Sequence, residues 1–156
     1  MRPFLLLPLL LAGCAHKPPA ELSSCTVIPN ELVTMAICGQ IIVAYQDITA
    51  PPDQGPPAFE GFNQGLVTGL TNKATNTPDV EKEDHPFAVN GAMVPGTFMT
   101  VKWDENDLHR QMSGYSAAIY GPSKMRLGAC FGLADAGSEQ PCLNALPYVM
   151  ANGIKK

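Results

Sequence analysis

The chain has 156 residues and a formal net charge of −4, with 10 Lys and Arg against 14 Asp and Glu. Its basic residues form no run, so the sequence offers no electrostatic support for nucleic-acid binding. The 15 prolines and 14 glycines are spread along the chain, which disfavours long helices and predicts many turns.

The first 13 residues have the composition of an export signal. A short cationic start, Met1-Arg2-Pro3, precedes an apolar stretch from Phe4 to Leu11. That stretch is about half of the roughly 20 residues that a helix needs to cross a bilayer. We therefore expect residues 1–13 to be a cleaved signal peptide and not a membrane span.

The signal ends in Leu11-Ala12-Gly13-Cys14, which resembles the lipobox of bacterial lipoproteins. The resemblance implies that Cys14 is joined to a diacylglycerol, that the chain is cut before it, and that its new amine receives a fatty acid such as palmitate. Two or three acyl chains, at about 0.8 kcal/mol per buried CH₂, make such an anchor effectively permanent. A plain signal peptide, in which Cys14 is incidental, is the alternative.

Ala15 follows the cysteine. In the lipoprotein family an Asp at this place retains the protein in the inner membrane, so its absence implies the periplasmic face of the outer membrane. Residues 14–24 predict a short solvated tether, and residues 25–156 a single globular periplasmic domain, which is long enough to bury its own core.

Four cysteines remain beyond Cys14, and an even number in an exported protein predicts two disulfides. Local pairing, Cys25 with Cys38 and Cys130 with Cys142, closes loops for which chain entropy gives about 3 kcal/mol each. Pairings that join the two ends of the domain stay open. A zinc site is disfavoured because the spacing contains no C-x-x-C knuckle.

The first half of the domain contains one clear strand. Ile41 to Tyr45 is apolar and β-branched, which predicts a buried strand with residues 32–38 as its hairpin partner or as a short helix. The prolines of 50–57 predict a loop. Glycines four residues apart in 58–72 fit either an amphipathic helix or an irregular loop, and the polar stretch 73–85 predicts an exposed connection.

The second half contains the stronger strand signals. Residues 86–89 and 97–103 predict strands, as do 115–120 and 125–131. Residues 104–112 predict a short helix capped by Asp104, and residues 138–151 a last helix that Pro147 would kink. Together these elements predict a small β-rich α+β domain with about five or six mostly antiparallel strands, short helices and two disulfides.

Candidate chemistry is sparse. The densest polar cluster, Asp104 to His109, lacks the glycine and glutamate of a calcium-binding EF-hand loop and is better explained by helix capping and solvation. His85 beside acidic residues is expected to be solvated, and no nucleophile pattern occurs. Tyr120 and Lys124 match the Tyr-x-x-x-Lys spacing of dehydrogenases by chance, because Gly and Pro intervene.

Aromatic side chains could form either an exposed surface for a partner or part of the core, and core packing is favoured. The residues concerned are Phe98, Trp103, Tyr115 and Tyr120.

The anchor together with the lack of catalytic patterns predicts a non-enzymatic envelope lipoprotein that binds a protein of unknown identity or supports a cell-envelope assembly. No metal or other cofactor is expected. The alternative is an immunity or inhibitor lipoprotein that neutralises a periplasm-acting toxin or lytic enzyme. In its favour, residues 94–103 faintly resemble small lipoproteins encoded beside type VI secretion effectors.

Overall fold

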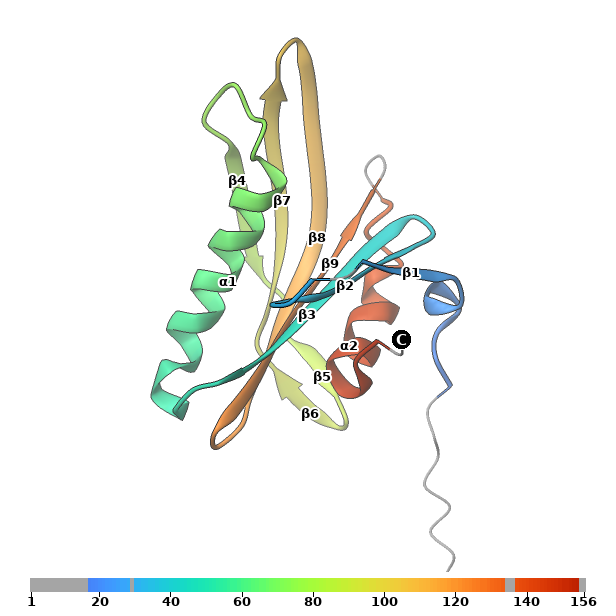
Figure 1. Cartoon of the computed structure of the whole chain (residues 1–156), viewed down its shortest axis with the longest axis vertical. Helices are drawn as coiled ribbons and strands as arrows, with labels where there is room; N and C mark the ends of the chain where they lie inside the picture. The colour runs from blue at the N-terminus through green and yellow to red at the C-terminus, as the bar shows by residue number, and fades with distance from the viewer. Residues whose placement is uncertain (1–16, 29, 134–136, 155–156) are drawn as a thin grey trace, which may run out of the picture.

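The computed structural model describes residues 17–28, 30–133 and 137–154. Seven antiparallel strands form one sheet in the order β1-β2-β3-β9-β8-β7-β4, and β5 and β6 form a separate hairpin (Figure 1). The strands are β1 (Cys25–Ile28), β2 (Thr34–Cys38), β3 (Ile41–Thr49), β4 (Asp79–Asp84), β5 (Phe87–Val89), β6 (Ala92–Val94), β7 (Gly96–Glu105), β8 (Leu108–Tyr120) and β9 (Lys124–Gly132).

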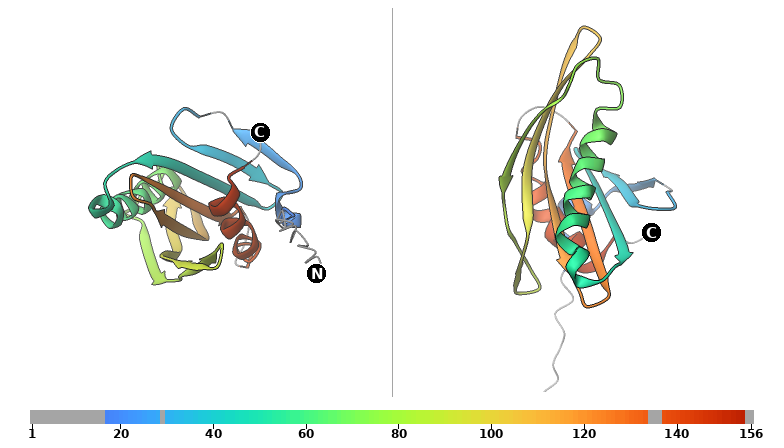
Figure 2. Two further views of the ribbon diagram at one scale, coloured as in Figure 1. Left: turned by 90° about the horizontal axis from the view of Figure 1, so that it is seen from below. Right: turned by 90° about the vertical axis from the view of Figure 1, so that its left-hand side faces the viewer.

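Two helices cover opposite faces of the sheet: α1 (Gly55–Leu70) and α2 (Cys142–Asn152), as both panels of Figure 2 also show. Side chains of a strand alternate between faces, and β8 illustrates this alternation. Its Ala117 belongs to the core cluster of α2, whereas Ala118 packs in the cluster of α1. The expectation of a β-rich α+β domain is therefore confirmed.

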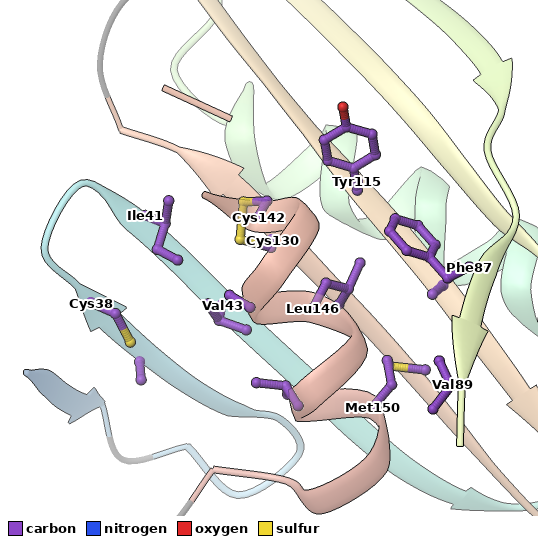
Figure 3. Close-up of a cluster of buried hydrophobic side chains, with 14 of the residues drawn as sticks. Cys38, Ile41, Val43, Phe87, Val89, Tyr115, Cys130, Cys142, Leu146 and Met150 are labelled. Atoms are coloured by element: carbon purple, nitrogen blue, oxygen red, sulfur yellow. A yellow bond between two sulfur atoms is a disulfide. The ribbon is translucent and has the colours of Figure 1, made fainter. Parts of the chain in front are cut away.

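The larger core lies between α2, the β5–β6 hairpin and the sheet. Leu146 and Met150 of α2 point toward Phe87 and Val89 of β5 (Figure 3), and Val43 of β3 belongs to the same core cluster. Leu146 and Met150 are almost completely buried. Pro147 lies inside this helix, which starts at Cys142, later than the predicted 138–151.

Both disulfides follow the local pairing: Cys25 with Cys38 and Cys130 with Cys142. The first joins directly opposite residues of β1 and β2. The second joins β9 to the first residue of α2, and both of its cysteines are fully buried (Figure 3). It therefore fixes the start of α2 against the centre of the sheet.

The helix predicted over 104–112 is wrong. These residues form the end of β7, a two-residue turn at Asn106 and Asp107, and the start of β8. Asn106 adopts a left-handed φ of 56°, a conformation that Asn reaches more readily than most residues. Asp104 is thus not a helix cap; it lies opposite His109 in the hairpin.

The described residues form nine strands where about five or six were predicted, because β1, β4 and β6 had no clear sequence signal. Strand β4 occupies the second half of the supposed connection 73–85 and pairs with β7 at the edge of the sheet. Five of its six side chains are exposed. Its Lys82 forms a 2.9 Å ion pair with Glu60 of α1. Its Glu81 forms a 2.9 Å ion pair with Lys102 of β7. Such charge suits an edge strand, which must not offer its free hydrogen-bonding groups to another chain.

The stretch 50–57 is partly helical and not simply a loop. A short 3-10 helix, η2 (Pro52–Gln54), leads into α1, and Pro56 and Pro57 occupy the first turn of that helix. Proline is tolerated there because the first backbone N–H groups of a helix have no partner within it. The glycine-spaced residues 58–72 fall mostly within α1, which settles the choice between helix and loop.

Part of the predicted tether lies against the domain. Residues Ala20–Leu22 form a short 3-10 helix, η1, in which Leu22 packs against the larger core and Glu21 accepts a 2.9 Å hydrogen bond from Asn144. The predicted signal peptide and Cys14 lie outside the described residues. Among the helices of the described ranges, none is long and apolar enough to cross a membrane.

Candidate functional site

An apolar groove runs between α1 and the neighbouring part of the sheet. Its volume is about 670 Å³, within the range typical of ligand pockets. One wall is α1 and the other is formed by β2, β3 and β9. The lining residues are Val33, Met35, Ile42, Ala44, Gln46, Gly61, Phe62, Gly65, Leu66, Gly69, Leu70, Ala129 and Phe131.

Three glycines form the helix side of this groove. Gly61, Gly65 and Gly69 are one helical turn apart and exposed, and a Cβ added at any of them would meet no atom within 4 Å. Their φ values lie outside the left-handed region, so the backbone does not require glycine there. Each glycine costs the helix about 1 kcal/mol relative to alanine. The bare helix backbone therefore has no explanation within the domain itself.

The sheet side of the groove is a surface that α1 leaves partly uncovered. Helix α1 packs on β8 and β9, while the side chains of Met35, Ile42 and Ala44 from β2 and β3 continue the same apolar face. Nearby Ile37 of β2 is 39% exposed and lies directly opposite Ile42. An apolar strip thus extends from α1 across β3 to β2.

The residues that line the groove are almost all apolar. Among the described residues that line it, Gln46 has the only polar side chain and none bears a charge. The lining therefore holds no titratable group for acid–base catalysis and no carboxylate, imidazole or thiolate to bind a metal. A surface of this kind stabilises apolar groups by removing them from water, at roughly 25 cal/mol per Å².

The acidic cluster predicted at 104–109 lies at the exposed β7–β8 turn, away from the groove. Asp104 and the His109 imidazole are 2.5 Å apart, and Glu105 pairs with Arg110 at 3.6 Å. Across the described ranges, no three His, Cys, Asp or Glu side chains gather in a way that could hold a metal ion.

His85 is half-buried against aromatic rings and not fully solvated as expected. Its ring lies 4.9 Å from the ring centroids of both Phe87 and Tyr115, and Phe98 lies 5.0 Å from Tyr115. Burial raises the pKa of the Tyr115 hydroxyl. These four rings form a cluster at the edge of the larger core.

The two remaining aromatic candidates differ in burial, because Trp103 is buried whereas Tyr120 is 36% exposed. Trp103 is 8% exposed. The ring of Tyr120 lies against Gly55 at the start of α1, with Lys124 beyond the following turn. Tyr120 and Lys124 therefore lie at the two ends of the β8–β9 hairpin turn and not on one face of a helix, as the dehydrogenase pattern would require.

The sequence indicated the helix side of the groove but not the sheet side. The four-residue spacing of the glycines is evident in the sequence itself. Nothing in the sequence showed that Met35 and Ile42 lie beside Phe131, because the local β2–β3 hairpin meets β9 only through long-range pairing.

Comparison with known proteins does not assign the chain to a family. No protein-family model matches the chain, and no curated protein sequence matches it significantly. Functional inference therefore depends on the residues of this chain alone.

Proposed function

We propose that this protein is a lipoprotein of the bacterial cell envelope, anchored through acyl chains on Cys14 to the periplasmic face of the outer membrane. In this proposal its domain acts as a non-enzymatic module that binds another protein. The lipobox-like residues 11–14 support the anchor. The two disulfides fit a compartment that oxidises thiols.

The groove along the glycine face of α1 carries the proposal of protein binding. Three glycines that serve no purpose within the domain leave the backbone of α1 open to close approach, beside an apolar sheet surface. Small residues at this spacing let two helices approach closely, and an apolar helix face in a groove is a recurrent mode of recognition. We propose that the partner inserts an apolar helical segment between α1 and β2–β3.

Site-specific crosslinking tests where the partner binds. A photoreactive amino acid at Met35, inside the groove, is compared in intact cells with one at Glu83 of the exposed edge strand β4. We expect a discrete protein adduct from position 35 and none from position 83. Equal adducts at both positions, or none at position 35, would overturn binding in the groove.

A pair of helix variants then separates binding from stability. Gly65→Leu fills the groove, whereas Thr68→Leu places the same side chain on an exposed position of α1 outside the groove lining. We expect Gly65→Leu to weaken partner binding at least about tenfold, which is roughly 1.4 kcal/mol, and Thr68→Leu to leave it unchanged. Circular dichroism verifies that both variants fold.

A further inference from the structure

The chain enters the domain at a fixed point. Lys17, the first described residue, lines a recess of about 610 Å³ together with the β5–β6 turn at Asn90 and Gly91 and one face of α2 from Leu143 to Asn152, including Tyr148. The following η1 is held by the Asn144–Glu21 hydrogen bond and by Leu22 in the core. The position of Lys17 relative to the domain is therefore set by packing.

The anchor proposed above lies very close to this point. Cys14 precedes Lys17 by three residues, and a fully extended residue spans at most about 3.6 Å. The Cα of the acylated cysteine therefore lies within about 11 Å of the Cα of Lys17. A link this short brings the recess beside Lys17 to the membrane surface.

The β7–β8 turn lies at the opposite end of the molecule. Figure 1 and the right panel of Figure 2 place this turn at one end of the long axis and the β5–β6 hairpin at the other. Strand β7 alone has ten residues, which at about 3.4 Å each separate its two ends by roughly 30 Å. Membrane contact at the Lys17 end thus leaves the β7–β8 turn far from the lipid.

The two ends of the molecule also differ in the charge and polarity of their side chains. Among the residues that the structure describes, Lys17 is the only charged one that lines the recess, and Met93 of the adjoining β6 is 66% exposed. Tyrosine and lysine are typical of membrane interfaces, and lysine is attracted to anionic lipid. The β7–β8 turn instead carries three carboxylates, Asp104, Glu105 and Asp107, against one arginine, Arg110, so it has a net negative charge that anionic lipid would repel.

We infer that a phospholipid surface is the partner of the Lys17 end: the β5–β6 turn and the C-terminal part of α2 rest in the headgroup region, and the β7–β8 turn points away from the membrane. This orientation rests on the lipid anchor of the proposed function. It leaves the groove along α1 on the side of the domain, open to a protein partner.

Tryptophan quenching in the full lipidated chain tests the orientation. Trp103, the only tryptophan, is replaced by Phe, and one Trp is introduced at Met93 or, as the matched control, at Leu108 of the β7–β8 hairpin, which is 55% exposed. The variants are reconstituted in phosphatidylethanolamine–phosphatidylglycerol vesicles with brominated acyl chains. We expect Met93→Trp to lose several-fold more emission than Leu108→Trp.

Hydrogen exchange on the unsubstituted lipidated chain gives a second measurement. Vesicles should slow exchange of the amides around Asn90 and Met93 and leave those around Asn106 unchanged. Equal quenching at the two positions, or protection at the β7–β8 turn, would overturn the orientation while the anchor stands. Mass spectrometry that finds no acyl chain on Cys14 would instead overturn the anchor, and with it the orientation.

Discussion

Arg126 of β9 holds both carboxylate oxygens of Asp47 on β3: its Nε donates to Oδ1 at 2.7 Å and its Nη2 to Oδ2 at 2.8 Å. Its Nη1 also donates at 3.3 Å to the backbone carbonyls of Val149 and Met150 near the end of α2. The guanidinium lies 4.6 Å from the ring centroid of Tyr45. One side chain thus joins two strands to the C-terminal end of a helix, where a positive charge is favourable.

Arg126→Met should lower the free energy of unfolding by about 2 kcal/mol, because it removes charge-assisted hydrogen bonds to a carboxylate and to helix carbonyls. Urea denaturation followed by circular dichroism measures the loss. Arg110→Met is the matched control, since Arg110 forms only an exposed pair with Glu105 at 3.6 Å, and such pairs contribute little. Equal losses from the two substitutions would contradict the role of Arg126.

The Asp47–Arg126 pair predicts a pH dependence of stability. The hydrogen bonds from Arg126 lower the pKa of the Asp47 carboxyl. A carboxyl with a lowered pKa in the folded state contributes stability above its unfolded pKa of about 3.9, and this stability is lost as pH falls through the lower folded value. The gap in unfolding free energy between the natural protein and Asp47→Asn should be constant above about pH 5 and close below about pH 4. A gap that is independent of pH would exclude this coupling.

The two disulfides should differ in what their removal costs. Their sequence separations are 13 and 12 residues, so loop entropy gives each about 3 kcal/mol. Cys130 and Cys142 are both fully buried, whereas only Cys38 of the other pair is, so replacing Cys130 and Cys142 by Ala leaves the larger cavity. We expect the Cys130→Ala/Cys142→Ala variant to unfold at a lower urea concentration than the Cys25→Ala/Cys38→Ala variant. The reverse order would contradict the argument.

Glycine substitutions should have opposite signs in α1 and β8. Gly65→Ala adds a Cβ in open space and should stabilise the domain by up to about 1 kcal/mol through helix propensity. In Gly114→Ala the new Cβ would clash with the carbonyl oxygen of Cys130, which should cost about 1–3 kcal/mol. Thermal unfolding of both variants gives the comparison. A destabilising Gly65→Ala would show that this helix face is not open in the free protein.

The strands that the sequence predicted are those with apolar side chains alternating along a continuous run. Strand β7 carries Met99, Val101 and Trp103 on one buried face, so its pattern was clear. The following residues Asp104 to Asp107 suit the first turn of a helix as well as a hairpin turn. Pairing of β7 with β8 decides between them, and local composition cannot reveal that pairing.

Strand β4 was hidden for a related reason. Its only half-buried side chain is Val80, so no apolar alternation marks it, and its place depends on ladder bonds to β7. The groove was half visible: glycine spacing indicated an unusual helix face, but nothing local predicts that Met35 and Ile42 face it. That arrangement follows from the register of β2 with β3 and of β3 with β9.

The charged edge strand β4 also bears on how copies of this domain behave when crowded. Proteins confined to a surface meet one another far more often than in bulk solution. A sheet edge with free backbone groups would then let neighbouring domains join into continuous ribbons. The acidic and basic side chains of residues 79–84 make joining through this edge unfavourable, so domains at high local density are kept from pairing along β4.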